Sequence, residues 1–125
     1  MEQDRFEELV RQALQGLPEE IAERMHNVDV EVQPEPSGAQ LAALGVPSGA
    51  TLLGLYQGVP LTKRTGGYNL VPPDRIIIFQ RPLEHVARDE ADLVLRVRST
   101  VVHEVAHHFG ISDERLREID RERHE

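Results

Sequence analysis

The apolar positions between Phe6 and Leu17 recur at steps of three and four residues, and charged residues fill the positions between them. This spacing places the apolar side chains on one face of an amphipathic helix. Gly16 and Pro18 interrupt the pattern, so we expect the helix to end near Gly16. The next segment, residues 19–25, has the composition of one or two further helical turns.

Three later segments have the pattern of β-strands. Residues 28–32 alternate valine with acidic residues, as in a half-buried strand, and Pro34 ends the alternation. "TLLGLYQG" (51–58) and "RIIIFQRP" (75–82) are short apolar runs rich in β-forming residues and bounded by glycine or proline. We therefore expect three strands, the last reaching Pro82.

Two glycine- and proline-bearing segments separate these strands. Residues 34–50 are expected to form a loop with one helical turn at "AQLAAL" (39–44). Residues 59–74 form a second expected loop, and its length is unusual for a compact domain without a functional reason. It carries Lys63, Arg64 and Tyr68, which are side-chain types that can stabilise an oxyanion, although a solvated loop is the favoured explanation for any one of them.

From Pro82 the chain contains no glycine or proline until Gly110, and its apolar residues follow helical spacing. A break near Asp89, which can serve as an N-cap, divides this segment into a short helix and a long one. Gly110 is suited to end the long helix. A polar last helix follows, with Ser112 or Asp113 as its cap.

Composition limits the possible classes of protein. The 125 residues fit one domain spanning residues 1–125, and we expect an α+β fold. The net charge of −8 disfavours nucleic-acid binding, and the absence of cysteine excludes disulfides and thiolate chemistry. No stretch approaches the roughly 20 apolar residues of a membrane span, so we expect a cytoplasmic protein without a membrane partner.

The segment "HEVAHHFGISD" (103–113) concentrates the candidate chemistry. His103 and His107 are four residues apart on the long helix, so their imidazoles leave the same face and can share one ion. Glu104 is rotated by about 100° from His103 and reaches the open side of that ion. Zinc held in this way keeps a water, whose pKa falls towards about 7, and a neighbouring carboxylate can act as general base.

The third zinc ligand has to come from beyond the helix. Gly110 lets the chain turn sharply, and Asp113 follows three residues later, where its carboxylate could return to the metal. Asp113 is our candidate for this ligand, although Asp113 could instead serve as the N-cap of the last helix. His108 is rotated away from His107, and we expect it to pack near the helix end or to lie at the rim of a cleft.

With these residues the sequence resembles the small bacterial zincin-like metallopeptidase family. The similarity extends to "GLYQGVPLTKR" and "PPDRIIIFQRPL", so it covers roughly residues 54 to 113. The resemblance implies a minimal zincin fold, in which a small mixed β-sheet of about three strands packs against an active-site helix with flanking helices. It also implies one Zn²⁺ ion and hydrolysis of a peptide or protein substrate. The chain lacks the methionine turn of metzincins, which share the motif spacing.

Several alternatives stay open at the level of sequence. Zinc could lock the last helices in place without catalysis, or the ligand spacing could be that of a metal-dependent endoribonuclease, which Glu104 and the net charge disfavour. Either of the last two strands could be an edge that binds an extended peptide, or a core strand. Thr100, one turn before His103, could support the site or simply lie on the helix surface. The small size also suggests that narrow access or a regulatory partner restrains cleavage.

Overall fold

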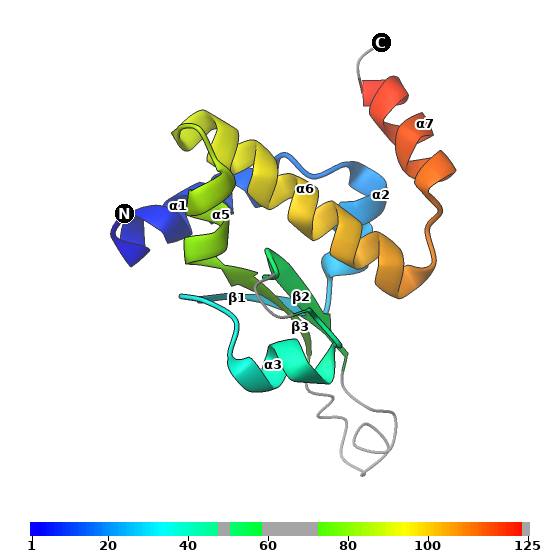
Figure 1. Cartoon of the computed structure of the whole chain (residues 1–125). Coiled ribbons are helices and arrows are strands. Elements are labelled where there is room, and N and C mark those ends of the chain that lie inside the picture. The colour runs from blue at the N-terminus through cyan, green and yellow to red at the C-terminus, as the bar shows by residue number, and fades with distance from the viewer. Residues whose placement is uncertain (48–50, 59–72, 124–125) are drawn as a thin grey trace.

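The structure is a computed structural model, and it describes residues 1–47, 51–58 and 73–123. The protein has an α+β fold, in which helices surround a small sheet (Figure 1). The helices are α1 (Gln3–Gln15), α2 (Glu19–Ala22), a 3₁₀ turn (Glu23–Met25), α3 (Gly38–Ala43), α5 (Gln80–Val86), α6 (Glu90–Phe109) and α7 (Asp113–Arg123); the strands are β1 (Val28–Gln33), β2 (Gly54–Gln57) and β3 (Asp74–Phe79). The expected mixed sheet of three strands is confirmed.

Within the described residues the sheet has the order β1-β3-β2, so β3 is central and β2 lies at an edge. β1 runs parallel to β3, with Val30 opposite Ile76, whereas β2 runs antiparallel to it, with Tyr56 opposite Ile76. All four residues from Ile76 to Phe79 are fully buried, as expected for a strand covered on both faces. The two strands that the sequence left equivalent are therefore different: β3 is a core strand and β2 is an edge strand.

The core lies between the sheet and α6, which crosses one face of the sheet (Figure 1). Val97, Val101 and Val105 repeat every four residues along α6 and are fully buried. α1 packs against the same helix through its apolar face, of which Phe6 and Ala13 are fully buried. α6 is thus fixed from two sides by apolar packing, which leaves its remaining faces available for polar side chains.

The predicted helix ends are largely confirmed. Asp89 caps α6, its side chain accepting a hydrogen bond from the backbone N–H of Asp92 at 2.8 Å. Gly110 follows α6 in the left-handed conformation, with φ 70°. The expected helical turn at residues 39–44 is α3, which Ser37 caps. No helix in the described part of the chain is long and apolar enough to cross a membrane.

One expectation is wrong, and another concerns residues outside the described part of the chain. β3 ends at Phe79 and not at Pro82, because α5 begins at Gln80. Pro82 then lies in the first turn of α5. The backbone N–H groups of this turn have no partner within the helix, so proline is tolerated there and the helix can begin before it. The loop residues Lys63, Arg64 and Tyr68 lie outside the described residues.

Candidate metal centre

The structure places His103 and His107 side by side on α6, as their spacing predicts. Both side chains are exposed, and their ring centroids are 6.4 Å apart with an interplanar angle of 69°. The helix forms here because the buried valines on its opposite rows hold it against the core. A rigid helix therefore presents two imidazoles to solvent on one row, which is the arrangement that a shared ion requires.

The ring of His103 is oriented by the helix turn before it. Its Nδ1 lies 2.8 Å from the backbone carbonyl oxygen of Ser99 and 3.3 Å from the Ser99 hydroxyl. A carbonyl oxygen only accepts hydrogen bonds, so Nδ1 carries the hydrogen and donates it. With the hydrogen on Nδ1, the lone pair that can bind a metal is on Nε2. Metal-binding histidines in proteins are commonly fixed by a second hydrogen bond of this kind.

Glu104 lies on the neighbouring row of α6, between Thr100 and His108 at steps of four residues. This row faces β2, since Thr100 contacts Gly54 and His108 stacks on Tyr56. The Glu104 side chain is half-buried, and this burial raises its pKa above the usual value, while the nearby His107 and His103 act in the opposite direction. Glu104 is thus placed between the histidine pair and the edge strand.

Thr100 has a packing role in this structure. Its hydroxyl donates to the backbone oxygen of Arg96 at 2.8 Å, and its methyl group lies so close to Gly54 that a Cβ atom there would be 2.5 Å from it. Only glycine lets β2 approach α6 to this distance. Thr100 therefore sets the separation between the edge strand and the helix, and it does not face the histidine pair.

His108 belongs to a cluster that sequence reasoning did not find. Its ring stacks on Tyr56 at 3.9 Å between centroids, and its Nε2 is 3.9 Å from an oxygen of the nearly buried Asp74. The Tyr56 hydroxyl donates to the same carboxylate at 2.6 Å. His108 does pack near the helix end, as expected, with 38% of its side chain exposed. Because the partners come from three separate segments, no local pattern could have indicated the cluster.

Asp113 begins α7 and is free of the capping role that competed with metal binding. Ser112 is the cap, because its hydroxyl oxygen accepts a hydrogen bond from the backbone N–H of Arg115 at 3.0 Å. Gly110 provides the left-handed turn that reverses the chain between α6 and α7. The exposed Asp113 side chain consequently faces the same cavity as the two histidines.

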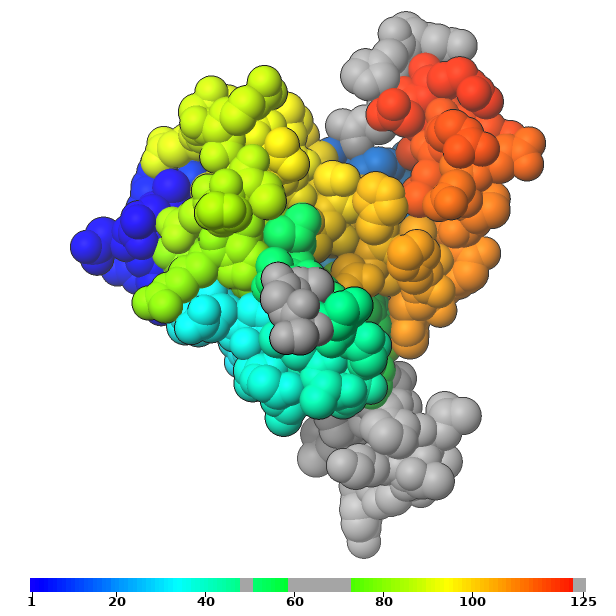
Figure 2. Space-filling model, viewed as in Figure 1, coloured from blue at the N-terminus to red at the C-terminus, as the bar shows by residue number. Residues whose placement is uncertain are grey.

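That cavity has a volume of about 750 Å³, and Figure 2 shows the recess between the yellow to orange surface of α6 and the red surface of α7. His103, His107 and Asp113 contribute to its lining, whereas Glu104, on the next helix row, does not. Apolar side chains supply much of the remaining wall; they are Pro18, Leu95, Val102, Leu116 and Ile119. A cavity of this size can hold several side chains of a peptide.

The types of the three candidate side chains suit zinc. Two imidazoles and one carboxylate are a common set in catalytic zinc sites. Within the described residues, however, no three histidine or acidic side chains already lie close enough together to hold an ion. The histidine pair is therefore formed by α6 alone, whereas the carboxylate of Asp113 lines the same cavity and has to approach the pair for the set to be complete.

Comparison with known proteins agrees with this description of the fold. A conserved hypothetical protein from T. thermophilus has a similar solved structure, with a TM-score of 0.53 and 21% identity over 86% of this chain and 92% of that chain. No curated protein matches the sequence. The family profile described as zincin-like metallopeptidase matches residues 25–123. This match includes the sheet, α6 and α7, and the chain therefore belongs to the zincin-like metallopeptidase family.

Proposed function

We propose that this protein is a zinc-dependent peptidase in which His103, His107 and Asp113 hold the ion and Glu104 is the general base. The observation that carries the proposal is the arrangement on α6. The Ser99 carbonyl accepts a hydrogen bond from Nδ1 of His103, which leaves the lone pair on Nε2, and Glu104 occupies the adjacent row, which faces β2. A base beside a metal-binding pair and within reach of an extended chain suits amide hydrolysis.

Zinc, when bound, polarises the substrate carbonyl and makes a water molecule more acidic. Glu104 then accepts one proton from the attacking water as its oxygen bonds to the carbonyl carbon. The same carboxyl group delivers that proton to the amide nitrogen as the carbon–nitrogen bond breaks. The products are a carboxylic acid and an amine, so one residue transfers the proton in both halves of the reaction.

The substrate lies along β2 in this proposal. Among the described residues β2 pairs with β3 alone, so its other edge can pair with an extended peptide through main-chain hydrogen bonds. The row containing Glu104 faces this strand, which brings a bound peptide close to the base. The net charge of −8 disfavours the phosphate backbone of RNA, which supports a peptide over a nucleic-acid substrate.

The test combines metal analysis with peptide hydrolysis. Purified protein is expected to bind one zinc per chain and to cleave members of a random peptide library, with cleavage lost on chelation and restored by zinc. Glu104→Gln is expected to keep the zinc and to lose at least about 100-fold in rate, as general bases contribute 10²–10⁴-fold. Glu114→Gln, the same change at an exposed position on α7, is the matched control.

Two outcomes would contradict the proposal. Cleavage that persists in Glu104→Gln would exclude the assigned base. Tight zinc binding without cleavage of any peptide, together with a large loss of thermal stability on chelation, would indicate a structural zinc module instead. Incubation of the same samples with RNA, with and without chelator, tests the ribonuclease alternative directly.

A further inference from the structure

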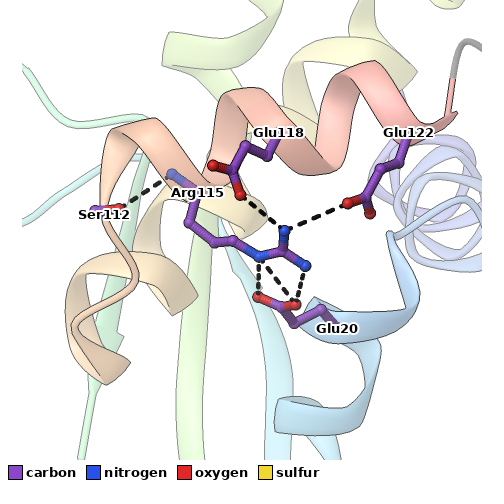
Figure 3. Close-up of polar contacts among 5 residues, drawn as sticks. All are labelled: Glu20, Ser112, Arg115, Glu118 and Glu122. Atoms are coloured by element: carbon purple, nitrogen blue, oxygen red, sulfur yellow. Dashed lines mark hydrogen bonds and ion pairs between the residues drawn. The ribbon is translucent and has the colours of Figure 1, made fainter.

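One side chain joins α7 to the N-terminal part of the chain (Figure 3). The guanidinium group of Arg115 donates to both carboxylate oxygens of Glu20 on α2, with distances of 2.7 to 3.3 Å. It also contacts Glu118 at 3.0 Å and Glu122 at 3.4 Å within α7. We call the pair of Glu20 and Arg115 the α2–α7 clasp. Hydrogen bonding to Arg115 holds the pKa of Glu20 below its usual value, so the clasp is charged at neutral pH.

α7 has few other means of holding its position. Of the α7 side chains that the structure describes, Ile119 alone is buried, and Leu116 is half-buried against the core. A polar helix with so small an apolar face gains little orientation from packing. A bidentate contact between a guanidinium and a carboxylate adds directional constraint that packing does not supply here.

The other end of the clasp is firmly anchored. Glu20 is followed by Ile21, which is fully buried in the core, so α2 is fixed to the body of the protein. At the α7 end, Arg115 is two residues beyond Asp113, and its backbone N–H bonds to the Ser112 cap. The clasp therefore fixes the first helical turn of α7, which is the turn that carries Asp113.

We infer that the α2–α7 clasp positions Asp113 for metal binding, with Glu20 and Arg115 acting as positioning residues that do not touch the ion. This inference rests on the proposed zinc site. Without the clasp the first turn of α7 can move farther from α6, which lengthens the distance that the Asp113 carboxylate has to cover to reach the histidine pair. The expected consequence is weaker zinc binding with unchanged ligands.

The chain contains a matched control for this idea. Arg5 and Glu90 also form a two-point ion pair between distant segments, with distances of 2.8 and 3.1 Å and somewhat greater exposure, but they join α1 to the start of α6. Glu20→Gln and Glu90→Gln remove the same charge from comparable pairs. Zinc affinity is measured by competition with a chromophoric chelator at pH 7. We expect Glu20→Gln to weaken zinc binding about 10-fold, as loss of supporting residues around metal ligands commonly does, and Glu90→Gln to leave it unchanged.

A second measurement uses the metal-free protein. The absence of cysteine allows spin labels to be attached only at introduced positions, such as Asp29→Cys on β1 and Arg121→Cys on α7, both exposed in the structure. Pulsed electron paramagnetic resonance then reports the distribution of distances between the sheet and α7. Glu20→Gln is expected to broaden this distribution, whereas Glu90→Gln is expected to leave it as in the parent protein.

The outcomes separate the clasp from the proposed zinc site. Asp113→Asn is expected to weaken zinc binding more than Glu20→Gln does; if it has no effect, the assigned ligand set is wrong. If Asp113→Asn weakens binding but Glu20→Gln behaves like Glu90→Gln, the clasp does not position the ligand. Tighter zinc binding in Glu20→Gln would overturn the inference as well, because it would mean that the clasp holds Asp113 away from the metal.

Discussion

Replacing Gly54 by alanine tests how closely β2 has to approach α6. A Cβ atom at this position would lie 2.5 Å from the methyl carbon of Thr100 and 3.2 Å from the backbone oxygen of Ile77. Carbon atoms prefer to be about 3.5–4.0 Å apart. The strand or the threonine therefore has to move by about 1 Å to accept the new methyl group.

The expected cost follows from two opposing effects. Overpacking of this kind costs about 1–3 kcal/mol, and replacing a strand glycine by alanine recovers about 0.5–1 kcal/mol of backbone entropy. We expect Gly54→Ala to lower the free energy of unfolding by about 1–2 kcal/mol, or roughly 4 °C in Tm for each kcal/mol. Thr100→Ser removes the clashing methyl group and keeps the hydroxyl that bonds to Arg96.

A double-mutant cycle measures the contact itself. Urea unfolding of the parent, Gly54→Ala, Thr100→Ser and the double variant gives four free energies, and we expect a coupling of about 1 kcal/mol that favours the double variant. If Gly54→Ala costs the same with and without the Thr100→Ser substitution, the reasoning is refuted. Zinc affinity serves as the control measurement, because the histidine pair lies on another row of α6 and should not respond.

Three further predictions concern the helix ends and the clasp. Asp89→Ala removes the cap of the long helix and is expected to cost about 1 kcal/mol in urea unfolding, with no change in zinc affinity. Gly110→Ala and Gly45→Ala both force alanine into the left-handed region, so each should cost about 1 kcal/mol, but only the former should also weaken zinc binding, because it alters the turn before α7. Arg115 lowers the pKa of Glu20, so stabilisation by the clasp is complete above the ordinary pKa of 4.5 and is lost as the pH falls through the lower value of the folded state. The difference in Tm between the parent and Glu20→Gln should therefore be constant near neutrality and vanish in acid.

Local patterns were sufficient to predict most of the fold. Valine alternation in β1, the apolar run of β3 and the unbroken segment up to Gly110 each reflect the environment of a single element, and the structure agrees with them. The boundary between β3 and α5 lies before Pro82 and not at it, because proline fits the first turn of a helix and does not mark where the strand ends. Which strand is the edge depends on pairing between distant segments, and neither apolar run contains that information.

In the candidate site, too, the sequence predicted the features that depend on local spacing and missed those that depend on contacts between distant segments. The positions of His103, Glu104 and His107 follow from helix geometry, so their spacing predicted which side chains share a row. Ser99 orients His103 through its backbone carbonyl. Every residue type has this carbonyl, so the amino acid at position 99 did not indicate the contact. The stack of His108 on Tyr56 and the clasp of Glu20 with Arg115 join residues far apart in the chain, and only the folded structure brings them together.

The buried valines of α6 also determine in which direction the side chains of the candidate site point. Val97, Val101 and Val105 determine how the helix is rotated about its own axis, and the imidazoles are carried by the same rigid body. A side-chain atom about 6 Å from the axis moves by about 0.5 Å when the helix turns by about 5°, which is comparable to the tolerance of a functional site. Core substitutions that preserve volume and stability can therefore still misdirect the proposed ligands, so a redesigned core has to be judged by metal affinity as well as by melting temperature.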